Sequence, residues 1–308
     1  MSALKYFHFA TALLPAVICA QGSAKRPLVI GVLSYESGES SAADSTSRAA
    51  ERGLQLGIEE AQQTARLFGR DVREKRVVIK RTDDAARAAR VMARTTMMSA
   101  LIVTNPELIP AAESVGRVGY AVVVMRTLPS AAPLDCSKFV FAVYPPDTDL
   151  HSLRNRWEAG GRYATRTVDS LGLPVAALWH SSLERFGALE LNDRYRARWK
   201  TGMTSEAWAA WVAVKILSEA SLRKQSVEPF LILDYITKSE FDGHKGWPLT
   251  FRAEDHFLRQ PIYMVSAGAD SKVAEELPRG SRSETQSASQ VLDAILPPHV
   301  NAGCGEQR

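Results

Sequence analysis

Residues 27–33 read Pro27-Leu-Val-Ile-Gly-Val-Leu33, an apolar run that begins after two basic residues and ends in a polar stretch. A run of this kind, without alternation, is typical of a strand buried on both faces of a sheet. The next segment, Arg48 to Arg70, is predicted to be a helix, because apolar residues recur in it every three or four positions. These residues are Leu54, Ile58, Ala61, Ala65 and Phe68.

The alternation of strand and helix continues to about residue 143. Further strands are expected at residues 77–79, 101–103, 120–125 and 139–143, and helices at 85–98 and 110–115. Short connections between these elements favour a parallel sheet that is covered by helices. The first half of the chain therefore predicts an α/β fold with a Rossmann-like lobe.

The second half of the chain is less regular. Residues 147–170 are rich in Arg, Asp, Thr and Gly and contain no apolar run that could form a buried strand. A helix from about residue 204 to 220, capped by Thr204 or Ser205, is apolar on nearly all sides, so Trp208 and Trp211 should be buried in the core. The other elements expected are a strand at 175–179, helices at 188–199 and 229–237, short strands between 243 and 265, and a loose polar tail from Ser266.

The N-terminal segment has the pattern of a secretory signal peptide. Lys5 supplies a positive charge, residues 7–20 are apolar and uncharged, and small residues follow at 20 and 22–24. We expect cleavage after Ala20 or Ala24, hence a periplasmic protein. No other stretch is apolar for about 18 residues, so the mature chain is expected to be soluble.

Charge and cysteine content narrow the function further. The net charge of +4 is spread along the chain, without a basic cluster interleaved with aromatic residues, so no nucleic-acid partner is expected. Cys136 and Cys304 remain after removal of the signal peptide. In an oxidising compartment they either form a disulfide or stay as two separate thiols.

Candidate ligand-binding residues follow the predicted strands. In an open α/β sheet, ligands bind beyond the carboxyl ends of the strands, and the side chains there are short, polar and suited to a small polar ligand. The same residue types also form turns and helix caps, so both roles stay open for each residue. The candidates are Ser34, Tyr35, Ser37, Asn105, Arg126 and Thr127, with Trp179, at the end of a strand, as a pocket-lining residue.

Signatures of catalysis are missing from the sequence. It contains no G-x-S-x-G elbow, no phosphate-binding P-loop, no G-x-G-x-x-G after a strand and no H-E-x-x-H, so no enzyme and no cofactor is predicted. Two groups could hold a cation, but neither has the spacing of four close ligands, and no metal site is assigned. They are His180 with Glu184, and His244 with Asp255 and His256.

Two stretches of the second half resemble a known protein family. One is Phe241-Asp-Gly-His-Lys-Gly-Trp-Pro-Leu-Thr-Phe-Arg252, continuing to Leu258-Arg-Gln-Pro-Ile262. The other is Leu178-Trp-His-Ser-Ser-Leu-Glu-Arg-Phe-Gly187, with Leu191-Asn-Asp-Arg194 and residues 203–211. Both are similar to the type I periplasmic substrate-binding proteins of ABC transporters that are associated with PQQ-dependent alcohol dehydrogenase systems. A cysteine pair like Cys136 and Cys304 also occurs in that family, which favours the disulfide.

The resemblance implies a two-lobed clamshell that delivers a ligand to an ABC permease. The first lobe would comprise residues 25–145 and 188–256, and the second residues 146–187 and 257–280, with a polar tail at 281–308. Residues 147–170 leave little room for the strand–helix repeats that the family's second lobe should contain. We therefore expect a strongly shortened second lobe, and closure around a ligand is in doubt.

The leading hypothesis is a periplasmic solute-binding component of an ABC import system that serves PQQ-dependent alcohol oxidation. A non-transport accessory protein, which would dock to a periplasmic partner through the retained lobe, is the main alternative. A metal carrier would require the His and acidic residues above to converge. An enzyme is the last choice, since no catalytic constellation can be assembled.

Overall fold

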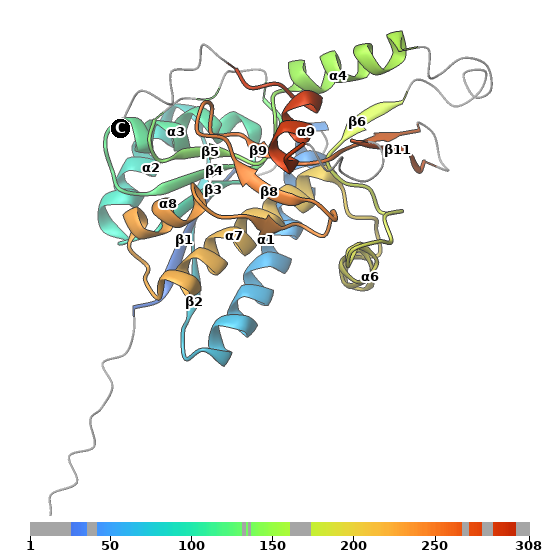
Figure 1. The fold of residues 1–308 in the computed structure, drawn as a ribbon. Helices are drawn as coiled ribbons and strands as arrows, with labels where there is room; N and C mark the ends of the chain where they lie inside the picture. The colour runs from blue at the N-terminus through green and yellow to red at the C-terminus, as the bar shows by residue number, and fades with distance from the viewer. Residues whose placement is uncertain are drawn as a thin grey trace, which may run out of the picture.

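In the computed structural model, five strands of the first half form one parallel sheet (Figure 1). The structure describes residues 26–35, 42–130, 134, 137–160, 174–266, 271–278 and 286–299, with only the backbone for residues 42–44, 82 and 83. The strands are β1 (Leu28–Tyr35), β2 (Val72–Ile79), β3 (Ala100–Val103), β4 (Val123–Arg126) and β5 (Val140–Ala142), in the order β2-β1-β3-β4-β5. The predicted parallel α/β lobe is confirmed.

The edge strand β2 is longer than the sequence predicted. It pairs with β1 over its whole length, from Leu28 opposite Val72 to Tyr35 opposite Ile79. Because it lies at the edge of the sheet, its middle is exposed and carries charged residues, so only its last residues form an apolar run. Charged residues on an edge strand also discourage pairing with another chain.

Helices cover the sheet on both faces. The pair α2 (Thr82–Thr95) and α3 (Ile109–Arg117) packs together, while α1 (Ala42–Leu67), α7 (Ser205–Lys224) and α8 (Pro229–Ile236) form a second group (Figure 1). The contact between α1 and α7 is close, because a Cβ atom at Gly53 would fall onto the backbone carbonyl of Ala207. The buried helix α7 begins after Thr204, as predicted, and carries Trp208 and Trp211 in the core.

A smaller unit adjoins the carboxyl edge of the sheet (Figure 1). Its three-stranded sheet has the order β11-β10-β6, with β6 (Val175–Ala177), β10 (Ile262–Val265) and β11 (Val273–Leu277) antiparallel to their neighbours. The sequence predicted no helix at 147–170, but α4 (Asp147–Ala159) forms there and packs against β6. Three apolar residues at helical spacing, Leu150, Leu153 and Trp157, are buried on one face of α4, and polar residues around them hide this pattern.

Two further elements connect the units. Helix α6 (Ala188–Trp199) forms as predicted and reaches α1 through ion pairs of Arg194 with Glu60 and of Arg198 with Glu59. The antiparallel strands β7 (Phe241–Asp242), β8 (Pro248–Phe251) and β9 (Leu258–Arg259) make a third sheet. Phe257 forms a bridge to Ala142, so this sheet lies beside β5.

The expectation of a loose tail from Ser266 is wrong for residues 273–277, which form β11, and for residues 288–295. Helix α9 (Ala288–Ile295) begins with a capping box of Ser287 and Gln290 and buries Leu292. Its apolar side is narrow, and the Ser-rich segment before it masks the helical pattern. The mixed composition that suggested a tail therefore belongs to a short amphipathic helix.

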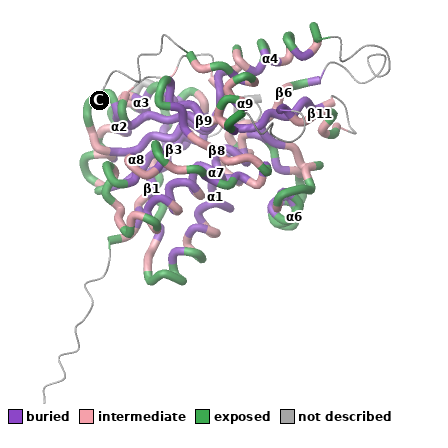
Figure 2. Tube along the Cα trace, in the orientation of Figure 1, coloured by how far each residue is buried: buried purple, intermediate pink, exposed green. Residues whose placement is uncertain are grey.

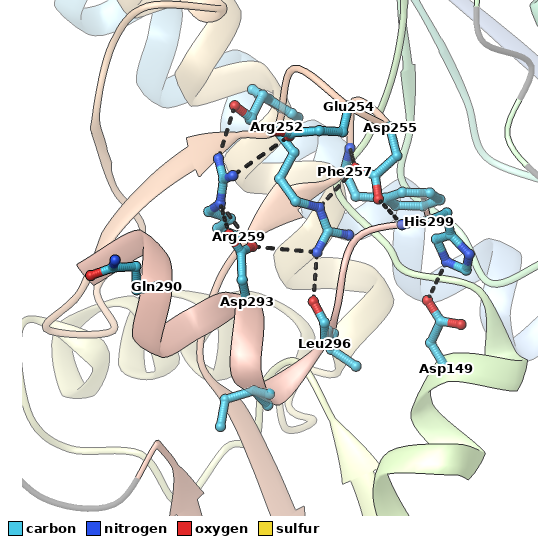
Figure 3. Close-up of polar contacts among 12 residues, drawn as sticks. Asp149, Arg252, Glu254, Asp255, Phe257, Arg259, Gln290, Asp293, Leu296 and His299 are labelled. Atoms are coloured by element: carbon cyan, nitrogen blue, oxygen red, sulfur yellow. Dashed lines mark hydrogen bonds and ion pairs between the residues drawn. The ribbon is translucent and has the colours of Figure 1, made fainter. Parts of the chain in front are cut away.

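Charged residues hold the C-terminal segment in place (Figure 3). Arg259 donates one bifurcated hydrogen bond from Nε to the two carboxylate oxygens of Asp293 in α9, at 2.8 and 3.0 Å. The buried Arg252 donates to Asp255 Oδ1 at 2.7 Å and to the carbonyl oxygen of Leu296 at 2.6 Å. Beyond α9, His299 Nε2 lies 2.8 Å from Asp149 Oδ2 of α4. One network of polar contacts therefore joins α9, the loop before β9 and α4.

Buried residues run through the first sheet and its helices and on into the smaller unit (Figure 2). Within the described part of the chain, no helix is both long and apolar enough to span a bilayer. The predicted signal peptide, Ser37, and the cysteines Cys136 and Cys304 lie outside the described residues.

Candidate functional site

The parallel sheet brings most of the candidate residues to one edge. Ser34 and Tyr35 end β1, Asn105 follows β3, and Arg126 and Thr127 lie at the end of β4. Parallel strands end at the same edge of a sheet, so these residues surround one end of it. Ser37 lies outside the described residues.

Three of these residues make contacts within the protein. Asn105 Oδ1 accepts a hydrogen bond from the backbone N–H of Glu107 at 2.9 Å and so caps a short 3-10 helix, η1 (Pro106–Leu108). The hydroxyl of Thr127 donates to the carbonyl oxygen of Val103 at 3.4 Å. Arg126 Nη2 donates to the carbonyl oxygen of Ser130 at 3.0 Å, which stabilises the loop after β4. Turn and cap formation therefore accounts for their residue types, and direct ligand contact stays a prediction.

Arg126 is a buried cation behind this edge. Only 1% of its surface is exposed, and its Nη1 lies 3.9 Å from Glu113 Oε1. Burial lowers the pKa of the guanidinium, while the carboxylates of Glu113 and Asp147 act in the opposite direction. The two carboxylates partly offset the charge of Arg126, and its side chain is not exposed at the edge.

Trp179 lies away from this edge, at the turn after β6. Its indole is 1% exposed, stacks on Trp208 with ring centroids 5.9 Å apart, and donates from Nε1 to Asn192 Oδ1 at 2.9 Å. The side chain is therefore mainly a core residue. A small part of the residue still borders the hollow described below.

The N-terminus of α7 adds polar groups that the list of candidates omits. Ser205 Oγ accepts hydrogen bonds from the backbone N–H groups of Leu178 and Trp179, at 3.0 and 3.3 Å. Glu206 accepts one from the hydroxyl of Tyr144 at 3.3 Å and one from the hydroxyl of Thr204 at 2.7 Å. The helix cap predicted at residues 204–205, followed by an acidic residue, is the signal by which the sequence could have pointed here.

Tyr144 and Glu206 join the two units at this point. Tyr144 follows β5, and Asp147 begins α4 three residues later. Burial raises the pKa of the Tyr144 hydroxyl, and the nearby carboxylates of Glu206 and Asp147 raise it further. The phenol therefore stays protonated and donates its hydrogen bond to Glu206.

A hollow of about 230 Å³ opens beside the N-terminus of α7. One wall consists of the turn before α7 and its first residues, including Thr204, Ser205 and Glu206, and the other of β6, β10 and the turn at residues 179–181. The hollow thus lies between the large sheet's helix layer and the smaller unit. Its volume is below the roughly 300–1,000 Å³ of drug-sized ligand sites, so it suits a small metabolite.

A second hollow, of about 660 Å³, lies between α1 and α7. The two helices touch at Gly53 and Gly57 and then separate toward their C-terminal ends, which leaves a groove between Phe68 and Leu222. Trp211 and His244 stack at its inner end, with ring centroids 5.3 Å apart. This groove does not reach the carboxyl edge of the sheet.

The residues considered as metal ligands have other contacts. Among the described residues, no three His, Cys, Asp or Glu side chains are close enough to hold one ion. Asp255 binds Arg252, His256 Nδ1 lies 2.9 Å from the carbonyl oxygen of Val140, and His180 contacts the hydroxyls of Ser182 and Ser271. Burial lowers the pKa of His180 and of His256.

Solved structures with the same arrangement are substrate-binding proteins. An ABC transporter substrate-binding protein from Sphaerobacter thermophilus aligns with a TM-score of 0.61 at 15% identity, over 82% of this chain and 98% of its own. The chain has the type I periplasmic binding-protein fold. In the described part of the chain, the smaller unit consists of α4, the three-stranded sheet and the adjoining loops.

Two further structures of this fold contain small ligands. A branched-chain amino acid transporter substrate-binding protein from Streptococcus pneumoniae, in complex with isoleucine, aligns with a TM-score of 0.60 at 15% identity, over 82% of this chain and 99% of its own. A solute-binding protein from Rhodopseudomonas palustris, in complex with benzoate, aligns with a TM-score of 0.61 at 13% identity, over 82% and 96%. No protein-family model and no curated protein matches the sequence.

Proposed function

We propose that this protein is a periplasmic solute-binding component of an ABC import system. The observation that carries the proposal is the set of polar groups at the N-terminus of α7, which border a hollow between the two units of a type I periplasmic binding-protein fold. In proteins of this shape, a ligand held between two lobes completes its contacts when the lobes close. The position of the hollow fits such a role.

The chemistry of the groups indicates the kind of ligand. Glu206 is a carboxylate and can only accept hydrogen bonds when ionised, whereas the hydroxyls of Ser205 and Thr204 can donate and accept. A ligand with hydroxyl or ammonium groups would therefore be preferred over an anion. The apolar side chains of Val175 and Val265 on the opposite wall would contact its carbon skeleton.

We further propose that the import system serves PQQ-dependent alcohol oxidation. This proposal rests on the resemblance of residues 178–187 and 241–252 to substrate-binding proteins associated with such systems. A hollow that prefers a hydroxyl-bearing ligand is compatible with it. The partner would then be the ABC permease of the same system.

Native mass spectrometry of the protein isolated from the periplasm tests the proposal. A monomer with a stoichiometric small adduct is the expected result, and the mass of the adduct gives the ligand class. A bare protein or a complex with another protein, without any adduct, would contradict solute transport and favour the accessory role.

Titration of the identified ligand then tests the site. We expect Glu206→Gln to weaken binding about tenfold or more, because a hydrogen bond to a charged group contributes roughly 1.5–3 kcal/mol. Glu190→Gln, in the first turn of α6 and exposed, is the matched control and should bind as the unchanged protein does. Equal affinities for all three proteins would place the ligand elsewhere.

A further inference from the structure

The opposite edge of the large sheet has an unusual surface. The strands of a parallel sheet begin at one edge, so the connections that lead into β2, β3, β4 and β5 lie together there. The ends of α1 and α7 reach the same edge (Figure 1), and Arg70 Nη2 donates to the carbonyl oxygen of Gln225 at 2.6 Å. We call this the amino-terminal edge, and it lies at the far end of α7 from the candidate ligand site.

Large apolar side chains are exposed along the amino-terminal edge. Leu67 is 83% exposed, Phe68 64% and Met97 76%. The apolar side chains of this edge are Leu67, Phe68, Met97, Val118, Phe230 and Leu231. They come from the ends of α1, α2 and α3 and from the start of α8. The lower end of α1 is exposed in Figure 2.

Basic side chains stand between these apolar residues. They are Arg66, Arg70, Arg94, Arg117, Lys138 and Arg223, of which all but the partly buried Arg70 are exposed. Lys138 Nζ lies over the Phe230 ring, 5.9 Å from its centre, so a cation and an exposed apolar ring are direct neighbours. The amino-terminal edge thus combines positive charge with exposed apolar side chains.

The carboxylates nearby are neutralised within the protein. In the described connections of this edge they are Asp71 and Glu228. Asp71 pairs with Arg73 at 2.7 Å, and Glu228 pairs with Arg26. The net charge of the amino-terminal edge is therefore clearly positive, although the net charge of the whole chain is only +4.

We propose that the amino-terminal edge is a docking surface for an anionic lipid bilayer. Separate apolar side chains can each enter the headgroup region of a bilayer, while arginine and lysine bind lipid phosphates above them. The centre of a protein–protein interface is instead poor in charged residues, whereas basic side chains stand between the apolar ones here. Arg26 also lies on this edge through its bond to Glu228.

Sedimentation of the full chain with lipid vesicles tests this surface. Vesicles of phosphatidylcholine alone are compared with vesicles that also contain phosphatidylglycerol, at low and at high salt. We expect partitioning onto the anionic vesicles to be about tenfold stronger or more, and to fall as salt screens the charges. Equal binding to both kinds of vesicle, or binding to neither, would overturn the proposal.

Two double variants locate the binding. Arg66→Glu with Arg223→Glu, at two exposed positions, should lower partitioning about tenfold or more, since each basic residue contributes near the surface. Leu67→Ser with Phe68→Ser should also lower it. Both variants keep residues 1–25. If they bound vesicles as strongly as the unchanged chain, residues 1–25 alone would account for membrane binding, which would contradict the proposal.

Matched controls make the test specific. Lys200→Glu with Lys272→Glu changes the net charge equally at exposed sites away from the amino-terminal edge, and Phe186→Ser removes a ring that is 50% exposed elsewhere. Both should bind as the unchanged chain does. Equal losses in the charge control would show a response to net charge only and would overturn a defined docking surface. Unaltered melting temperatures confirm that the variants are folded.

Discussion

The ammonium group of Lys245 lies in the interior, with no exposed surface. It donates to Gln260 Oε1 at 2.7 Å and to the carbonyl oxygen of Pro261 at 3.2 Å, and it lies 3.7 Å from the centre of the Trp208 ring. Gln260 in turn donates to the carbonyl oxygen of Val143 at 2.6 Å. Lys245 therefore ties the loop after β7 to both chain segments that lead between the two units.

Burial lowers the pKa of Lys245 well below 10.5, against the opposing effect of the carboxylate of Glu276. Between this lowered pKa and 10.5, the folded protein binds fewer protons than the unfolded chain. The free energy of unfolding should therefore rise with pH across this window, by up to about 1.4 kcal/mol per pH unit.

Lys245→Met should remove this rise. Urea unfolding between neutral pH and pH 10.5 measures it, as the difference in unfolding free energy between the variant and the unchanged protein. Lys75→Met, at an exposed position in β2, is the control and should keep the rise. Parallel curves for the unchanged protein and Lys245→Met would show that Lys245 does not cause it.

At the level of single residues, the sequence predicted positions better than roles. Strand ends are visible as the ends of apolar runs, so Ser34, Asn105 and Arg126 were placed at the correct edge. Their side chains could not be assigned, because a cap such as Asn105 and a ligand contact use the same residue types. The burial of Trp179 depends on Asn192 and Trp208, which come from other parts of the chain.

The crossing of α1 and α7 is the main helix contact of the large lobe. It depends on glycine, because the backbone of α7 occupies the space in which a side chain at Gly53 would lie. At Gly57 a Cβ atom would be 3.0 Å from Val214 Cβ and 3.1 Å from the carbonyl oxygen of Trp211, which small shifts can relieve. The two positions therefore differ in how much added volume they tolerate.

Gly53→Ala should lower the free energy of unfolding by about 1–3 kcal/mol or more, since added volume at a close contact forces the backbones apart. Gly57→Ala is the matched control and should cost less, because alanine also favours the helix by up to about 1 kcal/mol. Urea unfolding of both variants measures the difference. A loss at Gly57 equal to that at Gly53 would contradict the close crossing.

Elements with a regular apolar pattern were predicted well, and those without one were missed. The helices at 188–199, 204–220 and 229–237 appear close to their predicted bounds. Helix α4 has only a few apolar residues among charged ones, and α9 is short and follows a Ser-rich segment. Both are stabilised by contacts with distant parts of the chain, which a local pattern cannot show.

The whole molecule has one continuous core. Buried residues of the large sheet, such as Leu101, belong to the same cluster as Leu153 of α4 and Met264 of β10. The pairing of β6 with β10 joins the two stretches that the sequence assigned to a second lobe. That assignment, with its bounds at 146–187 and 257–280, stays a prediction and agrees with this pairing.

A shared core should make unfolding cooperative across both units. Urea transitions followed by far-ultraviolet circular dichroism and by tryptophan fluorescence are expected to coincide. The tryptophans report on both units, since Trp157 lies in α4 and Trp208 in α7. Two separate transitions would show that the smaller unit unfolds independently.

The contacts of Arg252 also bear on the order in which the molecule can be completed. Its partner Asp255 lies three residues away, but Leu296 is added to the chain 44 residues later. Until then this buried guanidinium lacks one acceptor, and Arg259 lacks Asp293. A nascent chain therefore cannot complete this buried network before α9 has been synthesised and has packed against the loop before β9.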